Sequence, residues 1–251
     1  MQKIEIMGIP FDNVTLSEAV RLAFEFINAG KQALAVTPNA EILLLCLRGE
    51  EVKNAVLSAE IILPDGEGAL WAAKKLGAPL CEKVAGVDFG AECARRAAAE
   101  SKSIFLLGGK VGVAEKAAER LRACFPSLNI AGTADGYFNR DSEENAAVIG
   151  KINESRADIL FVCLGAPTQE IWASKNRASL SPRLIACLGG SLDVYAGEVQ
   201  RAPKAFIKMR LEWLWRIVRD PRRIKRAAAL PKFITAVYEY KQKLKKTRNI
   251  K

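Results

Sequence analysis

Apolar residues along the chain form two patterns, short continuous runs and longer stretches with helical spacing. Gly, Pro, Asn or Asp closely follows each continuous run, which is typical of a buried strand that ends in a turn. Strands are expected at 33–37, 61–63, 103–107, 128–132, 159–164 and 184–188. Helices are expected at 41–47, 52–58, 68–76, 88–101, 113–124, 142–153 and 169–178. A capping box from Thr15 to Glu18 predicts a further helix, which Gly30 ends.

The predicted strands alternate with the predicted helices throughout residues 1–195. Their spacing is that of β-α-β units, and the strands are apolar along their whole length. Strands of this kind are buried on both faces. The sequence therefore predicts an α/β fold, with a mostly parallel sheet covered by helices on both faces.

The pattern becomes amphipathic and basic after residue 195. Apolar residues recur at helical spacing between residues 207 and 218, and Asp220-Pro221 predicts the start of a second helix. A third helix is expected after Pro231. It ends in a lysine cluster formed by Lys241, Lys243, Lys245 and Lys246. We therefore divide the chain into a body, residues 1–195, and a basic helical appendage, residues 196–251.

The charge of the chain is divided in the same way. The whole sequence has 251 residues and a net charge of +10. The appendage holds 17 Lys and Arg against four acidic residues, whereas the body holds 21 against 24. A nearly neutral body with a cationic appendage favours a polyanionic partner, such as anionic lipid, nucleic acid or phosphate groups.

Two interpretations of the appendage remain open. Its helices could pack on the body with solvated cations outside, or a basic, Trp-bearing amphipathic segment could lie on an anionic membrane. No recognised nucleic-acid module is visible, so nucleic acid is the weaker alternative.

The sequence also indicates a compartment. No run of about 18 uncharged apolar residues could cross a bilayer, and the first residues lack a signal-peptide pattern. The six cysteines are scattered without a C-x-x-C pair, which is typical of reduced thiols in a cytosolic protein. We expect a cytoplasmic protein that reaches a membrane only from its surface.

Small and polar residues follow the predicted strands. In a parallel sheet, ligands bind outside the carboxyl ends of the strands, so these residues are expected to share one cleft rim. They are Thr37-Pro38-Asn39, Asp65-Gly66, Gly108-Gly109, Asp135-Gly136-Tyr137, 165–170 and 189–193. Taken singly, each group could have a structural role instead of binding a ligand. Thr37 and Asn39 could be turn or capping groups, and Gln169-Glu170 could start a helix.

Asp65 is the carboxylate best placed for chemistry. It directly follows a predicted strand, between Pro64 and Gly66. The sequence contains no histidine, so a general base near neutral pH has to be a carboxylate, an activated Lys, Cys or Tyr, or water. Asp65 is therefore the candidate base.

Gly108-Gly109 has two interpretations, turn chemistry or a phosphate site on backbone N–H groups. The sequence lacks the G-x-G-x-x-G and P-loop patterns, which leaves NAD and ATP without specific support, and we expect no cofactor. D-x-D is absent as well, so we expect no bound metal. In a sugar-nucleotide enzyme of this kind, amides, Arg or Lys would have to meet the charge of a departing diphosphate.

Seven motifs together resemble the WecG/TagA/CpsF glycosyltransferases. They are TPNAE (37–41), LPDGEG (63–68), FLLGG (105–109), DGYF (135–138), GAPTQE (165–170), GGSLDVYAGEVQRAP (189–203) and LEWLWRIVRDPRR (211–223). The resemblance covers nearly the whole chain. It implies a Rossmann-like α/β body and a carboxyl-terminal appendage that docks on the membrane and completes the active site.

The resemblance also implies an activity. Members of TagA type transfer N-acetylmannosamine from its UDP donor to a lipid-linked N-acetylglucosamine, with inversion, in building the linkage unit of wall teichoic acid. Other members of the family would move a different sugar, such as UDP-ManNAcA or UDP-glucose, to a lipid-linked acceptor. The implied partners are the UDP-sugar, a polyprenyl-diphosphate-linked sugar and the anionic inner face of the plasma membrane.

Roles of individual residues follow from the same resemblance. Asp65 matches the proposed base; Thr37, Asn39 and Gln169 match pocket residues; and Tyr137 and Asp193 match positions near the nucleotide. Asp135, Gly108 and Gly109, which also follow predicted strands, are assigned to the same nucleotide side. Arg216, Arg223 and Arg226 match arginines thought to reach the diphosphate. Two positions depart from the family. Lys83 stands where Arg is common and cannot grip a phosphate bidentately, and Thr168 stands where a basic residue is usual.

Two other classes of function are alternatives to the transfer of a sugar. A nucleotide-dependent oxidoreductase would have a similar body, but the dinucleotide fingerprints are missing. A non-catalytic module would bind nucleic acid through its appendage. The sequence does not specify the sugar, the final polymer or the number of subunits, and a homo-oligomer is among the states it allows.

Overall fold

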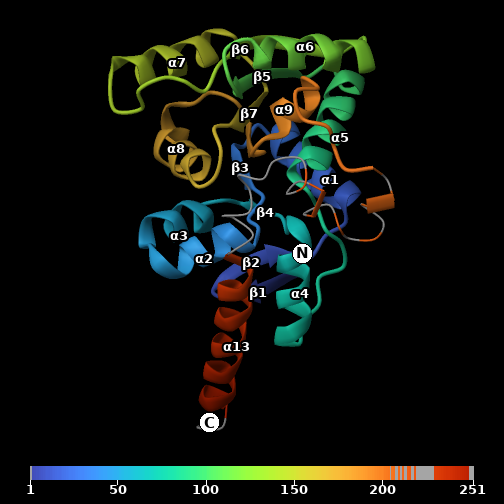
Figure 1. Cartoon of the computed structure of the whole chain (residues 1–251). Coiled ribbons are helices and arrows are strands. Elements are labelled where there is room, and N and C mark those ends of the chain that lie inside the picture. The colour runs from blue at the N-terminus through green and yellow to red at the C-terminus, as the bar shows by residue number, and fades with distance from the viewer. Residues whose placement is uncertain are drawn as a thin grey trace.

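The structure is a computed structural model that describes residues 2–203, 205–206, 209, 211, 214–215, 218 and 229–248. Its centre is a six-stranded sheet in the order β4-β3-β8-β7-β5-β6 (Figure 1), and every neighbouring pair is parallel. The strands are β3 (Ala33–Val36), β4 (Ile61–Ile62), β5 (Ser103–Gly108), β6 (Asn129–Ala134), β7 (Ile159–Cys163) and β8 (Leu184–Cys187). The six predicted strands and the parallel α/β fold are confirmed.

The helices predicted in the body are also confirmed, with bounds that shift by a few residues. They are α1 (Leu16–Asn28), α2 (Ala40–Arg48), α3 (Glu50–Leu57), α4 (Gly66–Leu76), α5 (Gly86–Ala99), α6 (Val113–Cys124), α7 (Glu143–Glu154) and α8 (Thr168–Asn176), which continues into a 3₁₀ turn, η1 (Arg177–Ser179). The capping box forms as predicted. The Thr15 hydroxyl accepts from the Glu18 N–H, and the Glu18 carboxylate accepts from the Thr15 N–H.

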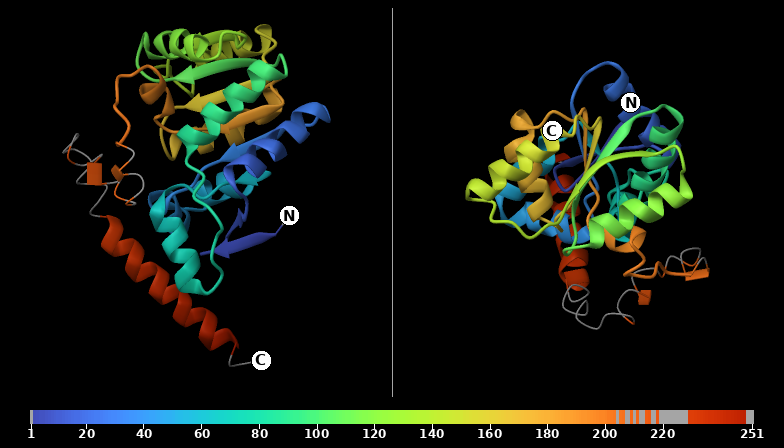
Figure 2. Two further views of the ribbon diagram at one scale, coloured as in Figure 1. Left: turned by 90° about the vertical axis from the view of Figure 1, so that its right-hand side faces the viewer. Right: turned by 90° about the horizontal axis from the view of Figure 1, so that it is seen from above.

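Helices cover both faces of the sheet because alternate strand residues face two separate apolar cores. On β7, Ile159 and Phe161 belong to the first core, together with α1, α5 and α6. Leu160 and Val162 belong to the second core, together with α2, α3 and α8. All four are fully buried, as continuously apolar parallel strands require. Figure 2 shows these layers from two further sides.

Two elements of the structure were not predicted from the pattern of apolar and polar residues. One is a hairpin formed by β1 (Lys3–Ile6) and β2 (Ile9–Asp12), which turns at Met7-Gly8 with positive φ at both residues. Buried Asp12 attaches the hairpin to the sheet, because its carboxylate accepts from the Ile62 N–H of β4 at 2.8 Å. Within the hairpin, the same carboxylate pairs with Lys3 at 3.0 Å. The other is α9 (Ser191–Tyr195), which is too short to show helical spacing.

The last helix, α13 (Ala229–Arg248), packs against α2 and α4 and extends beyond the sheet (Figures 1 and 2). Its described part already includes Ala229 and Leu230, ahead of Pro231, so the predicted start after Pro231 was wrong. Phe233 and Val237 are buried in the second core. The predicted helix start at Asp220-Pro221 lies outside the described residues.

Within the described ranges, no helix has both the length and the apolar character that crossing a membrane would require.

Candidate functional site

The turns after the strands meet at one edge of the sheet, because all six strands are parallel. Three hydrogen bonds join four of these turns. The Asp65 N–H donates to the Pro38 carbonyl at 3.4 Å, and the Thr37 hydroxyl donates to the Cys187 carbonyl at 3.2 Å. The Gly189 N–H then donates to Gln169 Oε1 at 2.9 Å. The ends of β4, β3 and β8 and the start of α8 thus form one continuous rim.

Asp65 lies at the amino end of α4, where it is half-buried. It occupies the N-cap position, but its carboxylate makes no capping hydrogen bond to the helix. Lys83 lies in the adjoining loop, which the Val84 N–H ties to the Pro64 carbonyl at 2.9 Å. The Lys83 ammonium is 3.6 Å from a Glu67 carboxylate oxygen. The structure therefore pairs Lys83 with Glu67, which lies two residues after Asp65 and was not singled out in the sequence analysis.

Asn39 and Thr37 occupy the neighbouring turn. Asn39 Oδ1 accepts from the Glu41 and Ile42 N–H groups at 2.9 and 3.2 Å, so the capping interpretation is confirmed. Capping uses only the side-chain oxygen, which leaves the NH₂ group as the part of Asn39 that a ligand can use. Thr37 is almost completely buried, and a Cβ at Gly86 would lie 3.1 Å from its hydroxyl. The close approach of α5 to this hydroxyl therefore favours glycine at position 86.

Gln169 and Glu170 form a buried polar pair in the first turn of α8. Their exposed fractions are 2% and 0%, and Gln169 Nε2 donates to Glu170 Oε1 at 2.7 Å. Burial raises the pKa of Glu170 to about 7, although the hydrogen bond from Gln169 opposes the shift. The sequence analysis treated Glu170 only as a favourable first-turn residue and missed this environment. Its position beside Gln169 was the only signal available.

Gly108 and Gly109 lie where β5 approaches β7 most closely. Gly108 has φ +131°, and a Cβ there would lie 2.2 Å from the Cys163 carbonyl oxygen, so only glycine fits. The Gly109 N–H donates weakly to the same oxygen at 3.4 Å, and the Gly109 carbonyl accepts from the Gly136 N–H at 2.9 Å. Close packing therefore accounts for both glycines, and a phosphate at this turn stays a prediction.

Asp135 and Tyr137 lie next to this turn. The Asp135 carboxylate accepts from the Tyr137 N–H at 2.8 Å. Tyr137 is 72% exposed and is one of the residues that line a hollow of about 380 Å³. Arg140 donates to the Gly136 carbonyl at 3.1 Å and lies over the Phe138 ring. An exposed tyrosine ring on a structured loop offers a flat surface on which a base could stack.

Asp193 lies on α9, which packs between α5 and α6. Its carboxylate is close to Gly190, where a Cβ would lie 3.5 Å from Oδ2. The segment after α9 is tied back to the body, because Arg201 and Asp88 form a bidentate pair at 2.5 and 2.6 Å. The first residues of the appendage thus adjoin the start of α5. Arg216, Arg223 and Arg226 lie outside the described residues.

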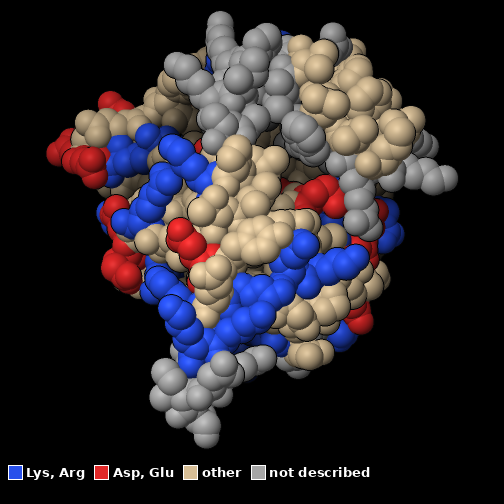
Figure 3. Space-filling view, turned by 60° about the horizontal axis from the view of Figure 1, so that its bottom comes forward, with Lys and Arg blue, Asp and Glu red and all other residues tan. Residues whose placement is uncertain are grey.

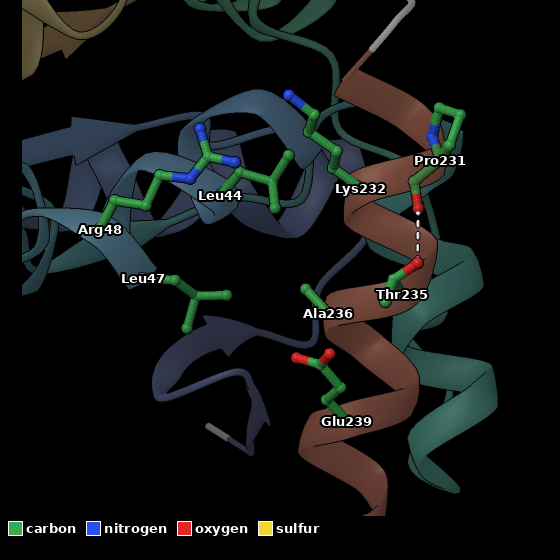
Figure 4. Close-up of a pocket in the computed structure, with 8 residues that line it drawn as sticks. All are labelled: Leu44, Leu47, Arg48, Pro231, Lys232, Thr235, Ala236 and Glu239. Carbon is green, nitrogen blue, oxygen red and sulfur yellow. Dashed lines mark hydrogen bonds between the residues drawn. The ribbon is translucent and has the colours of Figure 1, made fainter.

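A groove of about 400 Å³ runs between α2 and α13 (Figure 4). Arg48 and Lys232 carry cations along its upper part in that view, and Glu239 lies at its lower part. Apolar and small side chains lie between them. The lining residues are Leu44, Leu47, Arg48, Pro231, Lys232, Thr235, Ala236 and Glu239.

Lys and Arg side chains gather on the end of the molecule where α13 lies (Figure 3). On α13 itself Lys232, Lys243, Lys245 and Lys246 are exposed. Exposed apolar residues alternate with them, including Leu230 and Leu244. In the part of the chain that is described, no three His, Cys, Asp or Glu side chains cluster in a way that could hold a metal ion.

A parallel α/β sheet with polar groups gathered beyond its strand ends defines the class of nucleotide- and ligand-binding α/β proteins. Within that class, the chain matches the glycosyl transferase WecG/TagA/CpsF family over residues 4–249 and belongs to it. The resemblance inferred from the motifs is confirmed.

Curated relatives match along almost their whole length. An N-acetylglucosaminyldiphosphoundecaprenol N-acetyl-beta-D-mannosaminyltransferase of Bacillus spizizenii is 36% identical over 244 residues, covering 96% of this chain and 93% of the relative. The Staphylococcus aureus protein of the same name (strain MRSA252) is 31% identical over 248 residues, covering 98% and 96%.

Proposed function

We propose that the protein transfers N-acetylmannosamine from UDP-N-acetylmannosamine to N-acetylglucosaminyl-diphospho-undecaprenol, with inversion, in forming the teichoic acid linkage unit. The observation that carries the proposal is the similarity to enzymes of that name over nearly the whole chain. The matching part of the chain includes the motifs at the strand ends as well as α13. Transfer of another UDP-sugar to a lipid-linked acceptor is the second candidate, because family membership alone leaves the sugar open.

In the proposed mechanism, Asp65 is the general base. Its carboxylate takes the proton of the acceptor hydroxyl, whose oxygen attacks the anomeric carbon on the face opposite UDP. The new C–O bond forms as the bond to the diphosphate breaks, and UDP leaves with the bonding electrons. The position of Asp65 at the end of β4, on the rim formed by the carboxyl ends of the parallel strands, supports this role.

The sugar and the nucleotide would bind along the same edge of the sheet. Thr37, Asn39, Lys83 and Gln169 line the part nearest Asp65, which suits the sugar. Gly108, Gly109, Asp135, Tyr137 and Asp193 would surround UDP. The exposed Tyr137 supports stacking on uracil, and the other strands of the sheet lie between the β4 part of the rim and the β6 part.

The charge of the departing UDP would be met by arginines rather than by a metal. Arg216, Arg223 and Arg226 are proposed for this role because guanidinium groups bind diphosphate oxygens bidentately. No cofactor is required. We also propose that the described α13 and the segment before it form one appendage, residues 196–251, that completes the site over the body, residues 1–195. Phe233 supports this, because it lies beside Gly68 in the first turn of α4, close to Asp65.

The protein is proposed to work from the cytoplasm at the inner face of the plasma membrane. The basic end of α13 and the mixed cationic and apolar groove beside it suit anionic lipid and the lipid-linked acceptor (Figures 3 and 4). No nucleic acid partner is proposed, and a homo-oligomer stays an open alternative.

A donor screen tests the proposal. Purified protein is mixed with a short-chain lipid-diphosphate N-acetylglucosamine and with UDP-N-acetylmannosamine, UDP-ManNAcA or UDP-glucose, and release of UDP is measured. We expect release with UDP-N-acetylmannosamine that depends on the acceptor. Release with only a different donor would replace the sugar in the proposal, and no release with any donor would contradict transfer.

A further inference from the structure

Glu170 is a buried acid for which the proposed reaction has no use. Its side chain is completely buried at the start of α8, and only one of its oxygens, Oε1, has a hydrogen-bond donor, Gln169 Nε2. Oε2 is also buried, and no described residue donates to it. Burying a carboxyl group without a cation is costly, and an apolar side chain of the same size would stabilise the fold better. The stability of the fold therefore does not explain why an acid occupies position 170.

The surroundings of Glu170 supply no partner that would offset this cost. The titratable groups that face it are the thiols of Cys46 on α2 and Cys187 on β8. Burial raises the pKa of both thiols, so neither is a charged partner for the acid near neutral pH. No cationic side chain in the described ranges pairs with Glu170. Among the described side chains, Gln169 is the one that hydrogen-bonds to the carboxyl group, and the backbone of Glu170 itself adds a weaker interaction.

That hydrogen bond determines how the Gln169 amide is turned. Gln169 Oε1 accepts from the Gly189 N–H at 2.9 Å, while Nε2 donates to Glu170 Oε1 at 2.7 Å. Reversing the amide would set its NH₂ group against the Gly189 N–H and its oxygen against the Glu170 oxygen. Both contacts would then be repulsive. The amide is therefore held in a single orientation, with the second hydrogen of Nε2 uncommitted to Glu170.

We propose that Glu170 is a positioning residue that holds the Gln169 amide so that its remaining N–H donates to the bound sugar. The inference rests on the proposed function. Gln169 lies where the turns after β7 and β8 meet, on the same rim as Thr37 and Asp65, so a donor fixed there lies at the edge where the proposed substrates bind. A donor whose orientation is already fixed does not have to reorganise during the reaction, so no free energy is lost in orienting it.

Three variants test the proposal. Glu170→Met keeps the volume and removes the acceptor, Glu170→Gln keeps an acceptor oxygen, and Gln169→Leu removes the amide itself. We expect Glu170→Met to lower kcat/KM about 10- to 100-fold while its melting temperature stays level or rises, since a buried acid has been removed. Glu170→Gln should stay within about threefold of the unaltered protein, because its oxygen can accept from Gln169 Nε2. A purely structural role would instead lower activity and melting temperature together.

The double variant Gln169→Leu/Glu170→Met completes a thermodynamic cycle. If Glu170 acts only through Gln169, the double variant loses no more activity than Gln169→Leu alone. Losses that multiply, or a Glu170→Met variant that keeps more than half of normal kcat/KM, would overturn the proposal. The unaltered protein is measured in the same assay, so absence of any turnover there would count against the proposed function instead.

Discussion

Asp65 is the residue on which the proposed chemistry depends most directly. We expect Asp65→Asn to lower turnover by about 10²–10⁴-fold, because an amide cannot take the proton of the acceptor hydroxyl. Binding of UDP, measured by calorimetry, should change little, since Asp65 lies at the β4 edge of the sheet, far from the turn after β6. Exposed Asp141→Asn provides a matched control with the same chemical change. An Asp65→Asn enzyme with half of normal activity would remove the residue from the mechanism.

Glu170 predicts a pH dependence of stability. Burial raises its pKa from 4.5 to about 7, so the folded protein binds the proton more tightly than the unfolded chain. The resulting stabilisation is complete below the ordinary pKa and is lost as the pH rises through about 7. A shift of this size corresponds to about 3 kcal/mol.

The measurement is the melting temperature of the unaltered protein and of Glu170→Gln between pH 5 and pH 8. We expect the unaltered protein to lose stability relative to the variant as the pH rises, because glutamine does not titrate. Parallel curves for the two proteins would show that Glu170 does not titrate in this range.

At the scale of elements, α13 is held to the body by a few buried side chains. Phe233 is fully buried, and its ring centroid lies 6.3 Å from that of Trp71 on α4. Tyr238 also faces Trp71, at 6.2 Å, but is 46% exposed. Tyr240 adds a hydrogen bond from its hydroxyl to Glu5 on β1, at 2.7 Å. The helix is therefore part of the second core rather than a solvated extension.

We expect Phe233→Ala to lower the free energy of unfolding by about 3–5 kcal/mol, as for other buried phenylalanines. Tyr238→Ala, on the same helix and against the same tryptophan, should cost about 1 kcal/mol or less because the ring is largely exposed. Denaturant unfolding measures both. Equal, small losses would show that α13 contributes little to the stability of the body.

At the scale of the whole molecule, Lys and Arg side chains gather on the face that carries the end of α13 (Figure 3). We expect Lys245→Gln/Lys246→Gln to weaken binding to anionic vesicles about 30-fold, because each exposed lysine near such a surface contributes about 1 kcal/mol. The control is Lys31→Gln/Lys102→Gln, which removes the same charge from the body. Sedimentation with phosphatidylserine vesicles gives both affinities. Equal weakening in the two variants would mean that overall charge, and not the α13 end, attracts the membrane.

The sequence by itself determined most helices, the six strands of the sheet and its parallel direction. Helical period, continuous apolar runs and capping residues act over a few neighbouring residues, as the Thr15 capping box illustrates. The strand order was not needed to place Thr37, Asp65 and Gln169 on one rim, because all strands of a parallel sheet end at the same edge. The seven motifs were sufficient for the family.

Tertiary structure alone decided which polar groups are buried and what they contact. The start of α8 contains Gln169 and Glu170 in succession, and no local pattern distinguishes an acid that caps a helix from one enclosed by α2 and β8. The hairpin at Met7-Gly8 was missed although β1 alternates exposed and buried residues, because four residues form too short a pattern to stand out, and the bond from β4 to Asp12 is a tertiary contact. The docking of Phe233 beside α4 joins residues more than 150 positions apart, and contacts at such a distance arise only when the elements pack together.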